Sequence, residues 1–149
     1  MSDDHLFALL DKLDGRGSDQ EFNAIRELRR LVGDKLPSLL LVKYRSEKKW
    51  QIRCSCVYHS IKYARNVTDA VQLGIEGLSD KSKVVRYRSC MLLAYSLNKE
   101  VLPALYEIKQ KFKDEETIGN ADSAIDAIEN QNTNFFVDRK HTGKITLNV

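Results

Sequence analysis

The sequence is poor in residues that break regular structure: its 149 residues include seven glycines and two prolines. A β-sandwich or β-barrel needs a turn about every ten residues, so this scarcity argues against both. No apolar run approaches the roughly 20 residues that span a bilayer. The first ten residues, MSDDHLFALL, carry acids where a secretory signal needs basic residues. We therefore expect a cytoplasmic protein that does not enter the membrane.

The sequence also lacks the residue groups that catalysis or metal binding requires. Three cysteines, an odd number, are typical of a reducing compartment and do not suggest a disulfide framework. Residues 54–56 read Cys-Ser-Cys, but positions i and i+2 of a helix diverge, and no second Cys/His pair completes a zinc site. His59 falls at an inward repeat position, which favours a hydrogen-bonded core histidine over a base. We expect no enzyme activity, cofactor or metal.

The composition and charge point to one soluble domain with a basic centre. The chain is 42% hydrophobic and 30% charged, which suits a single domain over residues 1–149. The net charge is −3 over residues 1–34, +10 over 35–113, −6 over 114–130 and +2 over 131–149. A basic middle favours an acidic partner, either protein or nucleic acid. The alternative is a solvated charged face.

Apolar residues recur at helical spacing through residue 130, and short polar turns separate the periodic segments. Short turns favour antiparallel neighbours. The predicted helices cover residues 3–13, 19–32, 35–45, 48–65, 67–78, 81–97, 100–113 and 116–130.

An internal repeat is the most informative pattern in the sequence. Residues 35–39, Lys-Leu-Pro-Ser-Leu, match residues 101–105, Val-Leu-Pro-Ala-Leu, at an offset of 66. The pair Ile52-Arg53 matches Val85-Arg86 at an offset of 33. One helix pair cannot cover its own apolar stripe, so the pattern predicts stacked helix–turn–helix units.

These residues resemble short bacterial HEAT-like repeats: Leu-Pro-x-Leu on the first helix, an aspartate in the turn, and Val-Arg on the second. The resemblance covers roughly residues 19–130. It implies an all-α fold, a right-handed α-solenoid of about four helix pairs over residues 1–130. It also implies that Arg53 and Arg86 bond turn aspartates such as Asp80; direct contact with a partner is the alternative.

The pattern changes after residue 130. Residues 131–134 form a polar linker, and residues 144–149 alternate strictly between polar and apolar. With Gly143 in the turn, residues 135–149 predict a short C-terminal β-hairpin. Because a lone hairpin is marginal in water, it should cap the last helices. The alternative is an exposed edge that pairs with a partner strand.

Helical spacing also predicts a partner-binding face. Tyr87, Met91 and Tyr95 recur every four residues, and Tyr58 and Lys62 stand one repeat before Met91 and Tyr95. The resemblance places these second-helix positions on the concave side. With Arg88 beside them they have the aromatic, methionine and arginine content of binding hot spots. The alternative is that this stripe is core. The only tryptophan, at position 50, either contacts a partner or packs on the preceding helix.

Two functions follow as expectations. The first is a non-catalytic protein-binding module, narrowed by the resemblance to an immunity or inhibitor protein that binds and blocks a cognate toxin domain. The second is nucleic-acid binding by the basic central repeats, expected to be weak because the net charge is only +3. The sequence specifies no oligomeric state.

Overall fold

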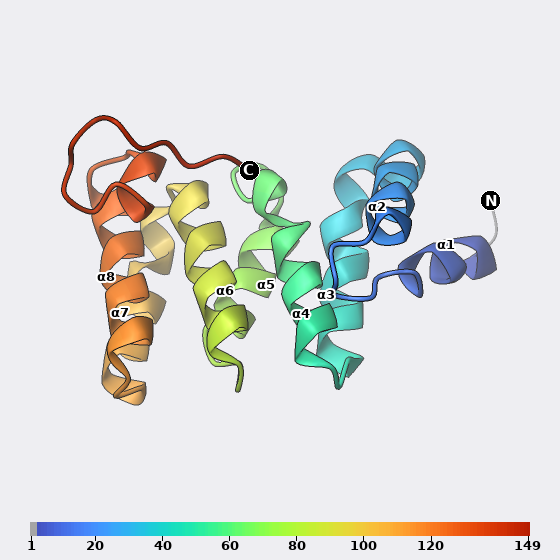
Figure 1. Ribbon diagram of the computed structural model, residues 1–149, viewed down its shortest axis with the longest axis horizontal. Coiled ribbons are helices and arrows are strands. Elements are labelled where there is room, and N and C mark those ends of the chain that lie inside the picture. Colours follow the sequence, from blue (N-terminus) through green and yellow to red (C-terminus); the bar gives the residue numbers. More distant parts are fainter. Residues whose placement is uncertain (1–2) are drawn as a thin grey trace.

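A computed structural model describes residues 3–149, and within that span the regular structure is entirely helical (Figure 1). No helix in the described span is both long and apolar enough to cross a membrane. The α-helices are α1 (Asp3–Leu10), α2 (Asp19–Val32), α3 (Leu36–Ser46), α4 (Trp50–Tyr58), α5 (Thr68–Gly77), α6 (Lys83–Ser96), α7 (Leu102–Lys111) and α8 (Glu115–Glu129). Short 3₁₀ turns cover Gly33–Lys35, Ile61–Tyr63, Lys99–Val101 and Thr133–Phe136.

The helices pack as neighbouring antiparallel pairs. Helices α3 and α4, α5 and α6, and α7 and α8 pack together, and α4, α6 and α8 form a front row in Figure 1. Within that row α6 contacts both α4 and α8. The arrangement is consistent with the helical repeat-like fold predicted from the sequence. The predicted 48–65 helix is shorter than expected, because α4 ends at Tyr58.

Local sequence signals set the helix starts. The side chains of Ser18, Ser82 and Asp114 each accept a hydrogen bond from a backbone amide in the first turn of α2, α6 and α8. Pro37 and Pro103 lie in the first turn of α3 and α7, where a missing N–H costs nothing. The eight α-helices of residues 3–149 equal the number of helical segments predicted from the sequence.

The arginine at the start of each second helix makes the same contacts in successive pairs. Arg53 donates to both carboxylate oxygens of Asp80, at 2.8 and 3.0 Å, and to the carbonyl of Lys48 at 2.8 Å. Arg86 donates to the carbonyl of Asp80 at 2.7 Å and lies 3.6 Å from the Asp114 carboxylate. Each arginine thus joins its own turn to the aspartate of the next turn. The predicted structural role of these arginines is confirmed.

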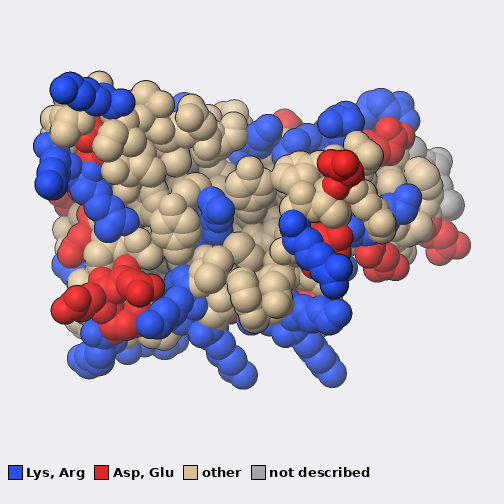
Figure 2. All heavy atoms as spheres, in the orientation of Figure 1, with Lys and Arg blue, Asp and Glu red and all other residues tan. Residues whose placement is uncertain are grey.

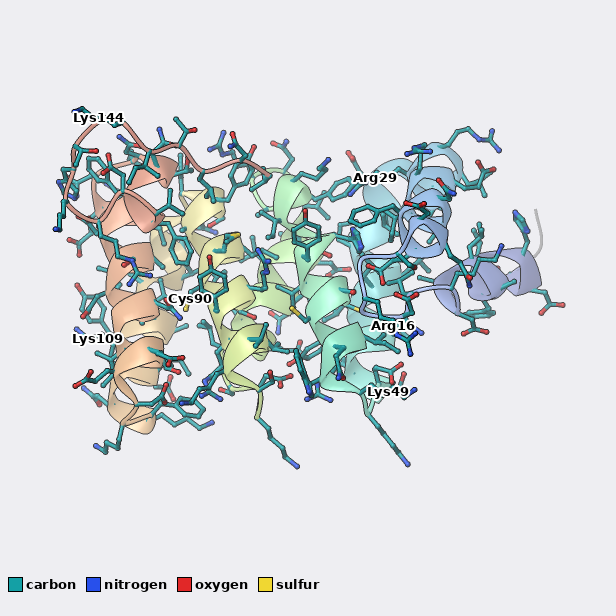
Figure 3. All side chains as sticks on the ribbon, in the orientation of Figure 1. Arg16, Arg29, Lys49, Cys90, Lys109 and Lys144 are labelled. Carbon is teal, nitrogen blue, oxygen red and sulfur yellow. The ribbon has the colours of Figure 1, made fainter. Side chains whose placement is uncertain are left out.

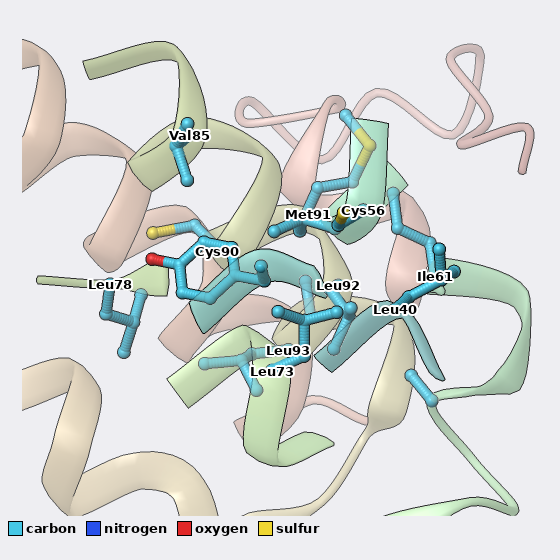
Figure 4. Close-up of a cluster of buried hydrophobic side chains, with 14 of the residues drawn as sticks. Leu40, Cys56, Ile61, Leu73, Leu78, Val85, Cys90, Met91, Leu92 and Leu93 are labelled. Carbon is cyan, nitrogen blue, oxygen red and sulfur yellow. The ribbon is translucent and has the colours of Figure 1, made fainter. Parts of the chain in front are cut away.

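Buried apolar side chains from several helices form the core, part of which Figure 4 shows. Leu92 and Leu93 on α6 are fully buried. They approach α5 at Gly74, where an added β-carbon would stand 2.7 Å from Leu92 and 3.0 Å from Leu93. At Gly77 it would stand 1.9 Å from the Ser89 hydroxyl oxygen. The absence of side chains at these glycines therefore allows α5 and α6 to pack closely.

The predicted β-hairpin is wrong, and with it the predicted fold class as a helical solenoid with a β element: residues 3–149 contain no strand. Residues 133–136 wind into a 3₁₀ turn instead, which buries Phe136 against the ring of Tyr87. The buried Asp138 carboxylate accepts bonds from the amides of Thr142 and Gly143, which closes a compact loop rather than a strand pair.

The last residues cross the helix ends without a partner strand (Figure 1). The amide of Leu147 donates to the side-chain oxygen of Asn134 at 2.9 Å, and Leu147 packs on the core. Ile145 and Val149 remain about half exposed. Of the three apolar residues in this segment, Leu147 alone packs on the core, so the alternation does not mark one buried side.

Candidate protein-binding face

Helices α4 and α6 bring four of the predicted binding residues together. The Arg88 guanidinium lies 5.1 Å from the ring centre of Tyr58 and 5.4 Å from that of Tyr87. It also donates to the sulfur of Met91 at 3.6 Å. Cation–π contacts with the two rings therefore place Arg88 between Tyr58 on α4 and Tyr87 on α6.

Met91 and Lys62 lie next to Tyr58. Met91 is only 5% exposed and belongs to the core. Together with Tyr58, these residues line a small cavity of about 80 Å³ that the C-terminal residues Asn148 and Val149 also line. The neighbouring Arg29 and burial together lower the pKa of Lys62.

Tyr95 lies one turn further along α6 and makes different contacts. The Arg65 guanidinium stands 4.2 Å from the Tyr95 ring centre and donates to its carbonyl at 2.9 Å. Tyr87 is half-buried between Arg88 and Phe136. The predicted stripe therefore divides into a cluster around Arg88 and a separate tyrosine at the end of α6.

A hollow of about 300 Å³ lies beside the Arg88 cluster, where α2, α4 and α6 meet. Four large apolar side chains line it: Phe22, Trp50, Tyr58 and Val84, each 40–44% exposed. Residues 3–149 contain nine large hydrophobic side chains that are at least 40% exposed, and these four are among them. Nearly half of the exposed large hydrophobic side chains therefore gather at this hollow. Figure 2 shows that the centre of this face is mostly uncharged, with basic side chains at its lower edge.

A buried acid–histidine pair lies under the hollow. The Nε2 atom of His59 is hydrogen-bonded to Glu21 at 2.7 Å, and both side chains are at most 2% exposed. The Glu21 carboxylate also accepts bonds from the amides of Asp14 and Gly15 and from the Ser55 hydroxyl. The pair therefore ties the 14–17 loop and α2 to α4. The prediction that His59 is a hydrogen-bonded core histidine is confirmed.

We expect Glu21→Gln to lower the free energy of unfolding by about 1–3 kcal/mol at neutral pH, the usual cost of weakening buried hydrogen bonds to a charge. Burial would raise the pKa of Glu21, but the hydrogen bonds from His59 and the Gly15 amide outweigh it and lower the pKa. A lowered folded-state pKa stabilises the fold above the unfolded-state pKa, roughly 4.3.

That contribution is lost as the pH falls through the folded-state pKa, because a protonated Glu21 resembles glutamine. Urea melts of both proteins at pH 7 and pH 3 measure the difference. The stability gap should shrink at pH 3. A gap that stays constant would show that the Glu21 charge contributes nothing to folding.

Other polar groups on the molecule offer little chemistry. The thiols of Cys56 and Cys90 are buried, and burial raises the pKa of each to about 12, so neither is an accessible nucleophile. No group of three His, Cys, Asp or Glu side chains within residues 3–149 is placed to hold a metal. A larger hollow, about 870 Å³, is open to solvent, and two of its lining residues, Arg53 and Asp80, bond each other.

Sequence reasoning missed part of this face. Phe22 lies on α2, which no repeat match ties to α4, and Val84 stood next to the predicted stripe without being included. Trp50 was assigned two alternatives, and its 42% exposure and position at the hollow favour a surface role. The sequence signal for a surface role of Trp50 was its place directly after Lys48 and Lys49.

Comparisons with known proteins do not assign a family. A scan against protein-family models finds no match for this sequence, and a search of curated proteins finds no similar sequence. The function therefore has to be argued from the face itself.

Proposed function

We propose that this chain is a non-catalytic protein-binding module that uses the face of α4 and α6 to cover a surface of its partner. One observation carries the proposal: the cluster of Tyr58, Tyr87 and Arg88 adjoins a hollow lined by exposed Trp50 and Phe22. Tryptophan, tyrosine and arginine are the residues most enriched in binding hot spots.

The geometry supports binding better than catalysis. The hollow is open and largely apolar. Its one buried carboxylate, Glu21, is hydrogen-bonded to two backbone amides, to the Ser55 hydroxyl and to His59. Its arginine is held between two rings. A surface whose polar groups are already satisfied can bind with little reordering, which reduces the entropic cost of association.

We further propose that the chain is a HEAT-like immunity or inhibitor protein of the cytoplasm, and that its partner is a toxin domain whose active site it blocks. One feature supports this: the 33-residue repetition of the Arg53 and Arg86 contacts. A basic centre would steer association with an acidic toxin surface.

Affinity capture tests the proposal. Wild-type protein and a Tyr58→Ala/Tyr87→Ala variant serve as matched baits for extracts of the source organism, and mass spectrometry identifies proteins retained by the wild type alone. The purified partner is then assayed for activity with and without this protein. Loss of partner activity at a one-to-one ratio supports the inhibitor proposal. Equal retention by both baits would exclude this face as the binding surface.

Nucleic-acid binding is the second candidate function, favoured by lysines in successive turns at residues 48–49 and 81–83. We expect weak binding of DNA and RNA that falls steeply with salt, because such contacts involve phosphates and release counterions. Gel-shift titrations at 50 and 200 mM salt measure this. Tight binding that resists salt and depends on base sequence would make nucleic acid the principal partner.

A further inference from the structure

The lysines around the apolar hollow specify the charge of what it binds. Lys49 directly precedes Trp50 at the start of α4, and Lys83 directly precedes Val84 on α6, and both of those neighbours line the hollow. In Figure 3, Lys49 projects away from the lower end of α4 into open space. The turns that lead into these helices add Lys48 and Lys81. Lys49 and Lys83 therefore stand next to two lining residues of the apolar hollow, whereas Lys48 and Lys81 line the neighbouring hollow around Arg53 and Asp80.

Within residues 3–149 no ion pair joins these lysines to an acidic side chain. Among residues 3–149, the ion pairs of this region join Arg53 to Asp80 and Lys43 to Glu47. None of them involves Lys48, Lys49, Lys81 or Lys83, which we call the rim lysines. All four rim lysines are exposed. Carboxylates of an acidic partner would pair with these exposed ammonium groups on binding.

Arg88 adds a fifth positive charge inside the hollow. It lines the hollow with Tyr58 and stands against the ring faces described above. The carboxylate nearest to it in the lining, Glu21, is buried and fully engaged by its own donors. Figure 2 shows one acidic group over the lower part of α8 and others towards α1 and α2. An incoming acid would meet Lys49 and Lys83 at the lower edge, whereas Asp14 directly precedes the lining residue Gly15.

We propose that the hollow receives an acidic protein segment with one large apolar side chain, which enters between Phe22, Trp50 and Tyr58 while flanking carboxylates pair with the rim lysines. This inference rests on the proposed function and adds the chemistry of the partner. A hollow with large apolar side chains and exposed charges beside it is the arrangement of a protein interface, where apolar anchors supply affinity and rim charges supply steering. A nucleic-acid groove would instead carry a row of cations along its length.

Trp50 makes the test direct, because it is the only tryptophan and lies at the hollow. The probe is a phage-displayed random library of 16-residue peptides that contain no tryptophan. The library is selected against the immobilised protein. We expect enriched peptides to carry several Asp or Glu residues around one Phe, Leu or Tyr. Synthetic copies should shift the fluorescence of Trp50, and replacing their apolar anchor with alanine should abolish the shift.

Charge reversal supplies the matched comparison. Lys49→Glu/Lys83→Glu should weaken the selected peptides at least about fivefold at low salt, because attraction at the rim becomes repulsion. Lys35→Glu/Lys99→Glu changes the net charge equally, on 3₁₀ turns outside the hollow, and should change affinity less than about twofold. Glutamate is favourable at a helix start, so the rim variant should remain folded, and a circular dichroism melt checks this.

Three results would overturn the inference: selected peptides without acidic enrichment, selected peptides that leave Trp50 fluorescence unchanged, or equal effects of the two charge variants. A twelve-residue oligothymidylate that shifts Trp50 more tightly than any peptide would replace it with nucleic-acid binding. The proposed function fails separately, if Tyr58→Ala leaves a captured protein partner bound. A partner that needs Tyr58 but ignores the rim variant would retain the function and refute the acidic chemistry.

Discussion

Leu93→Ala should lower the free energy of unfolding by about 2–5 kcal/mol, the range for truncating a fully buried leucine. Leu93 has no exposed surface, and its side chain lies against α5 at Gly74, where the two helices approach closely. The glycine has no side chain that could move into the space, so most of the cavity should remain. Loss of transfer energy and the cavity both contribute to the cost.

Urea or thermal melts measure the Leu93 effect. Val42→Ala is the control, because Val42 is 64% exposed on α3 and should change stability by less than about 0.5 kcal/mol. A loss below about 1 kcal/mol for Leu93→Ala would mean that α5 and α6 do not pack through this residue.

Tyr58→Ala should weaken binding of the protein partner at least tenfold, on the order of 1.4 kcal/mol. Tyr58 is 40% exposed, lines the hollow and holds one side of Arg88. The substitution removes an aromatic anchor and also frees the guanidinium, which then costs entropy to order on binding. Stability should change less, because an exposed ring contributes little to the fold.

A titration of the captured partner, run beside a melt of each variant, separates binding from folding. Tyr106→Ala is the matched control, since Tyr106 on α7 is 45% exposed and lies outside the hollow. It should bind normally. Lys62→Ala should mainly slow association and reduce its salt dependence, as for a charge at an interface edge. Normal binding by Tyr58→Ala would remove this face from consideration.

Contacts that repeat every 33 residues could be predicted from the sequence. The Arg53–Asp80 bond and the burial of His59 follow from repeat position and from the preference for satisfied polar groups. The approach of Tyr58 to Arg88 also follows from the repeat, since it places Tyr58 in register with Met91 on the neighbouring helix.

Features set by contacts outside the repeat could not be predicted. Phe22 reaches the hollow because Glu21 anchors α2 on His59, a pairing 38 residues apart that no local pattern encodes. Met91 is buried in a cavity that the C-terminal residues help to line, and the path of that segment depends on Asp138 and Asn134. Strict alternation at residues 144–149 predicted a strand, but only Leu147 of the three apolar residues packs on the core, and no partner strand forms within residues 3–149.

Hydroxyl-radical footprinting of the complex with the captured partner tests the central claim most directly, because tryptophan, tyrosine and methionine side chains report their own exposure. We predict that Trp50 and Tyr58 lose most of their reactivity when the partner binds, while Tyr106 keeps the reactivity it has in the free protein. Unchanged oxidation of Trp50 and Tyr58 in a fully formed complex would contradict the proposal that the α4 and α6 face binds the partner.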